Sequence, residues 1–306
     1  MDEKQKIRVT VITGFLGAGK TTFINGVLRK FPDIRFALVE NEFGEVSVDT
    51  RLIKGVDASR MFELRNGCIC CTISNEYELV LQELVQQFPS VGHLLIETTG
   101  VADPAPVVHP FWANENVRQL YTLNGVVCLV DSINFLSSAV QEISLKQLAS
   151  CDLAVISKTD RVTGKQRESV VARVRNVNPF CEISFAEKSD IGSFSPESLM
   201  VTPKFYVNLP KHRRLHADLQ ARTVTIPAGV EKERFTDWLS YTLDVYKNEI
   251  FRVKGVLTFR DEPYEYILQG VGGSWELSEG DLVWSKQENR IVFIGRLEKV
   301  HLEWLS

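Results

Sequence analysis

Short apolar runs alternate with longer stretches of helical periodicity through the first 190 or so residues. The apolar runs are predicted strands, and several are apolar at nearly every position, as strands covered on both faces are. They span residues 7–13, 36–41, 93–97, 125–131, 153–157 and 183–186. Between them apolar side chains recur at four-residue steps, as in Phe23, Val27 and Phe31, which is typical of amphipathic helices. Strands that alternate with helices indicate an α/β fold with a mostly parallel sheet.

The pattern changes after residue 192. Three prolines and a cluster of basic residues punctuate residues 193–221, which we interpret as a linker between a first domain, 1–192, and a second, 222–306. In the second domain a strand at 222–226 and a helix carrying Phe235, Leu239 and Leu243 precede four more predicted strands, at 253–259, 264–270, 274–277 and 291–295. Strands in succession without helices between them predict a smaller α+β domain.

Composition narrows the class of protein. The chain has 306 residues, enough for two domains, with 44% hydrophobic and 24% charged residues, as in an ordinary globular protein. The net charge of −4 gives no basic field for nucleic acid or an anionic membrane, so neither is an expected partner. With no signal-peptide pattern and no apolar run of membrane-spanning length, we expect a cytoplasmic protein.

A phosphate-binding motif follows the first predicted strand. Residues 14–22 match G-x-x-x-x-G-K-[ST] and open the first predicted helix, which is the context this motif requires. The backbone N–H groups of such a loop point at phosphate oxygens, the lysine neutralises the β- and γ-phosphates, and the hydroxyl after it binds Mg²⁺. The predicted nucleotide-binding residues are Gly14, Phe15, Leu16, Gly17, Ala18, Gly19, Lys20, Thr21 and Thr22.

The predicted strand 153–157 ends in a motif that favours guanine. Ser157, Lys158, Thr159 and Asp160 resemble the N-K-x-D sequence of guanine-specific proteins, with serine in the place of asparagine. The Asp160 carboxylate would accept hydrogen bonds from the guanine N1–H and amino group, a donor pair that adenine does not present. We therefore predict that the nucleotide is GTP.

Two strand-end carboxylates are candidates for the Mg²⁺ and γ-phosphate side. Glu97 ends the strand 93–97, and Gly100 three residues later could offer its N–H to the γ-phosphate and act as a hinge. Asp131 also ends an apolar strand. The E-x-x-G spacing favours Glu97, and we interpret Asp131 as a structural or capping carboxylate.

Three cysteines occur within four positions, Cys68, Cys70 and Cys71. In a chain without a secretory signal, thiols this close together favour a soft metal over disulfide bonds, although buried thiols are the alternative. The other cysteines, Cys128, Cys151 and Cys181, are predicted to be small core residues. A carboxylate-rich loop after the second strand could bind Mg²⁺, orient water or complete a metal site, or be a solvated acidic loop.

Five motifs in order resemble the CobW-type family of metal-chaperone GTPases, which includes bacterial YjiA-like members. They are G-F-L-G-A-G-K-T-T at residues 14–22, E-N-E-F-G-E-V at 40–46, G-C-I-C-C at 67–71, E-T-T-G-x-A-D-P at 97–104 and S-K-T-D at 157–160. The resemblance covers nearly the whole chain. It implies a GTPase that couples its nucleotide state to the binding or delivery of zinc or cobalt. It also implies a metal site formed by the three clustered cysteines with Glu40 and Glu45.

The predicted mechanism couples two sites. GTP·Mg²⁺ binds the phosphate loop and Asp160, while residues 40–49 and 100–106 act as switches around the γ-phosphate. The cysteine cluster lies between these switches in sequence, so metal affinity would depend on the nucleotide, and hydrolysis would release metal to an unidentified client protein. Either Glu42 or Asp49 would position the attacking water. The alternatives are a zinc-responsive regulatory GTPase that delivers no metal, and a P-loop ATPase or kinase with structural cysteines.

Overall fold

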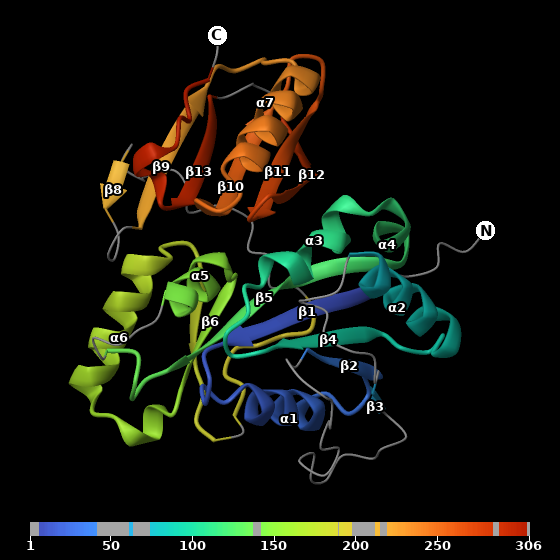
Figure 1. The fold of residues 1–306 in the computed structure, drawn as a ribbon, viewed down its shortest axis with the longest axis vertical. Helices are drawn as coiled ribbons and strands as arrows, with labels where there is room; N and C mark the ends of the chain where they lie inside the picture. Colours follow the sequence, from blue (N-terminus) through green and yellow to red (C-terminus); the bar gives the residue numbers. More distant parts are fainter. Residues whose placement is uncertain are drawn as a thin grey trace. The chain divides into compact units, whose positions relative to one another are not determined.

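The computed structural model describes residues 6–41, 61–63, 74–136, 142–188, 190–197, 212–214, 219–283 and 288–304. The chain divides into two compact units, residues 1–175 with 181–200 and residues 176–180 with 201–306. Each unit contains its own sheet (Figure 1).

The first unit is an α/β layer structure around a seven-stranded sheet. Its strand order is β3-β2-β4-β1-β5-β6-β7, and every neighbouring pair is parallel, which confirms the predicted fold class. The strands are β1 (Ile7–Gly14), β2 (Phe36–Asn41), β3 (Met61–Glu63), β4 (His93–Thr98), β5 (Tyr121–Asp131), β6 (Leu153–Ser157) and β7 (Glu182–Phe185). The helices are α1 (Lys20–Lys30), α2 (Ser74–Gln87), α3 (Ala105–Ala113), α4 (Glu115–Leu120), α5 (Glu142–Ser150) and α6 (Gly164–Val177), with a 3-10 turn, η3 (Thr159–Arg161).

The central strand β1 is buried along almost its whole length, because helices cover both faces of the sheet. Phe23 and Val27 of α1 pack on one face against Ile12 and Leu95, while α3 lies on the opposite side of the sheet (Figure 1). After α1 the chain reaches Pro32, which cannot continue a helix. Because the apolar face of α1 packs against the sheet, the start of α1 and the loop that precedes it are held at the end of β1.

Parallel strands bring their carboxyl ends to one edge of the sheet, and ligands of open α/β sheets bind at that edge. Gly14 at the end of β1 aligns with Leu129 of β5, and Asp131 at the end of β5 aligns with Ser157 of β6. Gly14 and Leu129, which are 115 positions apart in the chain, thus lie side by side at this edge.

The second unit is an antiparallel sheet with a helix, as predicted. Its strand order is β12-β11-β10-β13-β9-β8, and α7 contributes Phe235, Leu239 and Leu243 to an apolar core shared with the sheet. The elements are β8 (His212–Arg214), β9 (Gln220–Ile226), α7 (Lys232–Val245), β10 (Ile250–Thr258), β11 (Tyr264–Val271), β12 (Ser274–Leu282), β13 (Asn289–Gly295) and a 3-10 turn, η5 (Leu297–Lys299).

Element boundaries differ from the prediction mainly at polar ends. Strand β5 begins at Tyr121, four residues before the predicted start, and β12 continues to Leu282, five residues beyond the predicted end. The short strand β8 lies within the stretch that the sequence indicates as a linker, and it pairs with β9.

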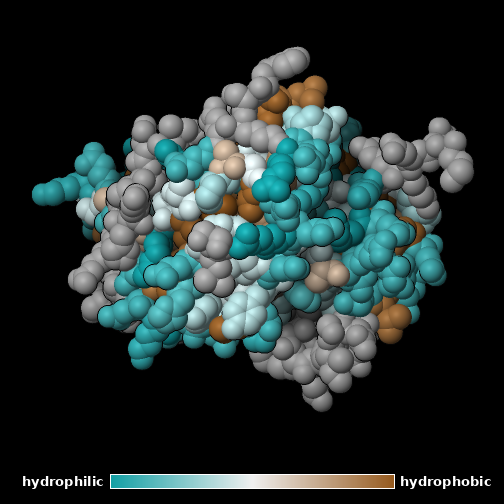
Figure 2. Space-filling view, turned by 90° about the horizontal axis from the view of Figure 1, so that it is seen from above, coloured by the Kyte–Doolittle hydropathy of each residue, from teal (hydrophilic) through white to brown (hydrophobic). Residues whose placement is uncertain are grey.

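The surface is mostly hydrophilic on the face drawn in Figure 2, where apolar residues lie in small separate groups. Within the described ranges, no helix combines the length and the apolar character that crossing a bilayer requires.

Candidate functional site

The loop between β1 and α1 has the backbone of a phosphate cradle. Its three glycines have positive φ angles, 137° at Gly14, 73° at Gly17 and 97° at Gly19, the residue that caps α1. At Gly14 a Cβ atom would also lie 2.5 Å from the carbonyl oxygen of Leu129, so a larger residue is excluded there. The first N–H groups of α1 have no partner within the helix and open toward this loop, as in anion-binding sites.

Lys20 begins α1 and is buried beneath the loop, with its Nζ donating to the carbonyl oxygen of Gly14 at 2.9 Å. Burial lowers the pKa of its ammonium group, and the charge of Glu97 is the largest opposing influence. The predicted phosphate lysine and the predicted Mg²⁺ carboxylate are therefore close enough to interact electrostatically. Thr21, the next residue, is partly exposed at the start of α1.

Glu97 lies near the carboxyl end of β4, beside the end of β1. Its backbone aligns with Ile12 of β1 on one side and with Glu40 of β2 on the other. Thr98, the next residue, donates its hydroxyl to the hydroxyl oxygen of Thr13 at 2.9 Å. These contacts hold the end of β4 at the phosphate loop. The side chain of Glu40 lies outside the described part of the structure.

Asp131, the last residue of β5, is held by three hydrogen bonds. Its carboxylate accepts hydrogen bonds from the Ile133 N–H at 2.9 Å, the Asn134 amide at 2.8 Å and the Lys158 ammonium at 2.8 Å. Burial acts to raise its pKa, but these three donors and the lysine charge outweigh burial and hold the pKa below its ordinary value. Asp131 therefore caps the turn after β5 and fixes Lys158, as its interpretation as a structural carboxylate suggests.

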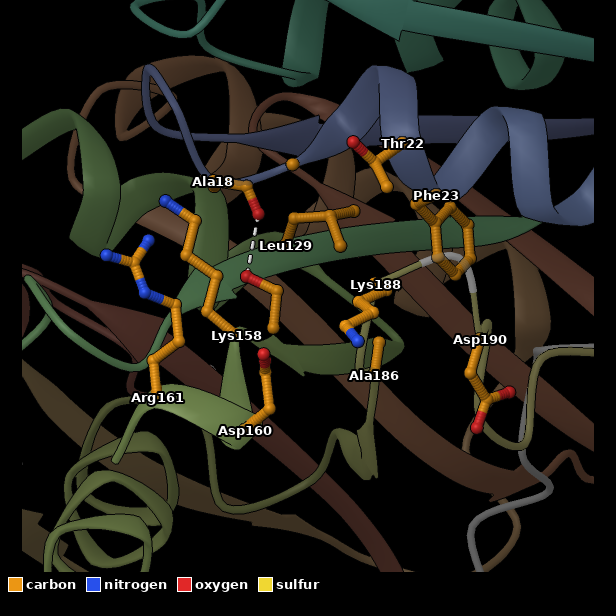
Figure 3. Close-up of a pocket in the computed structure, with 12 residues that line it drawn as sticks. Ala18, Thr22, Phe23, Leu129, Lys158, Asp160, Arg161, Ala186, Lys188 and Asp190 are labelled. Carbon is orange, nitrogen blue, oxygen red and sulfur yellow. Dashed lines mark hydrogen bonds between the residues drawn. The ribbon is translucent and has the colours of Figure 1, made fainter. Parts of the chain in front are cut away.

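A pocket lies where the S-K-T-D turn meets the phosphate loop (Figure 3). The Ser157 hydroxyl donates to the carbonyl oxygen of Ala18 at 2.7 Å, and a dashed line marks this bond in Figure 3. The pocket volume, about 210 Å³, is below the range of about 300–1,000 Å³ typical of drug-sized ligands. It is lined by Ala18, Gly19, Thr22, Phe23, Leu129, Ser157, Lys158, Asp160, Arg161, Ala186, Lys188 and Asp190.

Part of this pocket was missed by the sequence interpretation. Ala186, Lys188 and Asp190 follow β7, whose carboxyl end lies at the same edge as β6. Thr159 donates its hydroxyl to Glu187 Oε1 at 3.0 Å and so joins this segment to the S-K-T-D turn. The predicted strand at 183–186 was the available signal, because the residues after a parallel strand face the ligand edge.

Most residues of the predicted metal-binding site lie outside the described part of the structure. This applies to Cys68, Cys70, Cys71 and Glu45, and also to the two water-positioning candidates, Glu42 and Asp49. In the part of the chain that the structure describes, no group of three or more His, Cys, Asp or Glu side chains is arranged to hold a metal ion. Cys128, Cys151 and Cys181 are buried and form no disulfide bond with one another, as expected of core residues.

The glycine-rich loop between β1 and α1, with its buried lysine at the carboxyl edge of a parallel sheet, defines a P-loop nucleotide-binding domain. The sequence matches the family model "CobW/HypB/UreG, nucleotide-binding domain" over residues 8–185 and the "Cobalamin synthesis protein cobW C-terminal domain" over residues 219–304. The chain belongs to the CobW family.

Several characterised proteins are similar to the chain along most of its length. The zinc chaperone YjiA of Escherichia coli K12 is 33% identical over 308 residues, covering 94% of each chain. The zinc-regulated GTPase metalloprotein activator 1 of Saccharomyces cerevisiae is 25% identical over 362 residues, covering 99% of this chain and 83% of the relative. The crystal structure of Zn(II)-bound YjiA GTPase from E. coli superposes with a TM-score of 0.69 at 27% identity, covering 95% of this chain and 94% of that one.

Proposed function

We propose that this protein is a GTP-hydrolysing metal chaperone. It binds a transition metal, zinc in this proposal, through Cys68, Cys70 and Cys71 with Glu40 and Glu45. The binding or transfer of the metal is coupled to GTP hydrolysis.

One observation carries the nucleotide half of the proposal. The hydrogen bond from Ser157 to the Ala18 carbonyl joins the proposed base site to the phosphate loop, and both line the same pocket. A nucleotide could therefore place its base at Asp160 and its phosphates at the loop without a rearrangement of either site. In this arrangement Lys158, held by Asp131, covers one face of the base.

In the proposed mechanism the residues around the phosphate loop stabilise the negative charge of the phosphates. The loop N–H groups and the helix N-terminus bind the phosphate oxygens, and Lys20 neutralises the charge that develops on the transferred group. Thr21 and Glu97 have the oxygen donors that Mg²⁺ prefers, and both flank Lys20, so they would hold the ion. When bound, Mg²⁺ supplies positive charge to the β- and γ-phosphates. In this proposal Gly100 offers its N–H to the γ-phosphate, and Glu42 or Asp49 positions the water.

The metal half of the proposal rests on residue chemistry and on the relatives. Thiolates are ligands that zinc prefers, and three lie within four positions. Relatives named as zinc chaperones or zinc-regulated activators match nearly the whole chain, which supports zinc as cargo rather than as a fixed cofactor.

Competition binding tests the nucleotide. We expect GTP and GDP to displace a labelled guanine nucleotide, and ATP to compete poorly. An equal or greater preference for ATP would instead support the ATPase or kinase alternative with structural cysteines.

Zinc titration of a cysteine variant tests the metal site. A YjiA variant with one glutamate and two cysteines replaced by alanine has also been crystallised with zinc, so the presence of bound zinc does not by itself locate a site. Affinity is the informative quantity. Replacing both Cys70 and Cys71 by serine should lower zinc affinity steeply and leave the melting temperature and GTP binding unchanged.

Cys151→Ala provides the matched control, because this thiol is buried in the core. It should leave zinc affinity unchanged. Unaltered zinc affinity in a stable Cys70/Cys71 variant would contradict the metal site. Transfer of zinc to an apo-protein, compared between GTP and a non-hydrolysable analogue, separates a chaperone from a regulatory GTPase that delivers no metal.

A further inference from the structure

The segment after β4 presses against the phosphate loop. A Cβ atom on Gly100 would lie 2.6 Å from the backbone nitrogen of Leu16 and equally close to the Leu16 side chain. Backbone nitrogen cannot move aside without a change in the loop, so only glycine fits at this position. The segment Gly100–Ala102 and the phosphate loop are therefore in direct contact.

A buried glutamine holds the same segment from the other side. Gln147 of α5 is fully buried, and its Nε2 donates to the carbonyl oxygens of Gly100 at 3.3 Å and Ala102 at 3.0 Å. The two hydrogens of the amide thus serve two carbonyls of one short segment. The reversed amide would set its oxygen against both carbonyl oxygens, so the donor orientation is fixed.

The amide oxygen of Gln147 indicates that its hydrogen bonds, and not its packing, explain a glutamine at this position. Its Oε1 is buried and has no hydrogen-bond partner among the described residues. An unpaired buried acceptor is unfavourable, and a methionine of similar length would fill this space without it. The Gln147 side chain is therefore explained by its two donated hydrogen bonds rather than by packing.

We propose that Gln147 is a positioning residue for GTP hydrolysis, which holds Gly100–Ala102 against the phosphate loop so that this segment is ordered before the γ-phosphate arrives. The inference rests on the proposed GTP site. A segment that is already in place meets the γ-phosphate without a further loss of conformational freedom. GDP has no γ-phosphate, so its binding does not depend on this segment.

The variant Gln147→Met removes both donors and preserves volume. We expect its affinity for a non-hydrolysable GTP analogue to fall about tenfold, in the range of typical coupling between sites, while GDP affinity stays within about twofold. Turnover at saturating GTP should fall as well, because the segment spends less time in place. A purely structural role would weaken both nucleotides together or lower only the melting temperature.

Two further variants sharpen the test. Gln147→Glu keeps the shape but, as a neutral buried acid, can donate to at most one of the two carbonyls, so it should also lower the ratio of analogue to GDP affinity, and it serves if the methionine variant does not fold. Lys146→Met is the matched control on the same helix, because it removes a partly exposed 3.5 Å ion pair with the Asp103 side chain and leaves the Gln147 amide in place. The control should keep the wild-type ratio.

The outcomes separate this inference from the function on which it rests. Wild-type protein that binds neither guanine nucleotide would contradict the proposed function itself. Wild-type protein that binds both, with an unchanged affinity ratio in folded Gln147→Met or Gln147→Glu, would overturn the role of Gln147. An equal loss in Lys146→Met would overturn it too.

Discussion

Acid should destabilise the first unit through one buried histidine. His93, the first residue of β4, is 1% exposed, and its Nε2 lies 2.8 Å from the hydroxyl of Thr10. That hydroxyl oxygen accepts a hydrogen bond from Asn124 at 3.0 Å, so its own hydrogen can be donated to the imidazole. Two effects lower the pKa of His93 to about 3: burial, which is the larger, and the positive charge of Arg8.

The sign and size of the effect follow from this shift. An unfolded histidine has a pKa of about 6.5, so below that pH the unfolded chain binds a proton that the folded chain does not. The contribution is complete above pH 6.5 and is lost as the pH falls toward 3. At about 1.4 kcal/mol per pH unit, His93 alone should remove about 2 kcal/mol of unfolding free energy between pH 6.5 and 5, and at most about 5 kcal/mol by pH 3.

Urea unfolding at pH 7 and pH 5 measures this loss. The variant His93→Gln does not titrate and keeps a hydrogen-bonding group toward Thr10, so it should lose about 2 kcal/mol less than wild type over this interval. The exposed His109 of α3 provides the control, and His109→Gln should follow wild type. If His93→Gln and wild type lose the same free energy, the histidine is not the acid-sensitive group and the reasoning is wrong.

Three predictions concern the nucleotide site. Ser157→Ala leaves the buried Ala18 carbonyl without its side-chain donor, which should lower the free energy of unfolding by about 1–3 kcal/mol. Calorimetry should show that GTP and GDP both bind more weakly, and affinities equal to those of wild type would refute the role of this hydrogen bond in joining the base site to the phosphate loop. Asp160→Asn should reduce the preference for GTP over ATP by about 1–3 kcal/mol, and an unchanged preference in competition binding would remove Asp160 as the guanine reader. Lys20→Ala should lower turnover about 10²–10³-fold, as expected for the loss of transition-state charge stabilisation, without unfolding the protein; wild-type turnover in a phosphate-release assay would contradict the phosphate-loop assignment.

The parts predicted from sequence are those that local patterns determine. Strands β2 and β6 match their predicted bounds because each contains a run of four apolar residues, as expected of strands covered by helices. The phosphate loop could be placed because its glycines and lysine are fixed by spacing. Periodicity gave no signal for β3 and β8, each of three residues, or for the exposed polar end of β12, which pairs with β11.

The parts that sequence could not supply depend on strand order and burial. Ser157 reaches Ala18 because β6, β5 and β1 are neighbours, an order that the sequence does not state. Gln147 lies on an amphipathic helix where a polar residue is expected to face water, yet it is fully buried. Glu97 and Asp131 both lie at the ends of apolar strands, so the strand pattern alone does not show that Asp131 is bound by Ile133, Asn134 and Lys158.

The dependence of zinc affinity on the bound nucleotide tests the central proposal most directly. Zinc would be titrated into the full-length protein loaded with GDP or with a non-hydrolysable GTP analogue, in the presence of Mg²⁺. Coupling between the two sites predicts zinc affinities that differ by about 5-fold or more between the two states. By linkage the same factor should appear in the nucleotide affinities measured with and without zinc. Identical zinc affinities in the two nucleotide states would contradict a chaperone whose metal binding is governed by GTP.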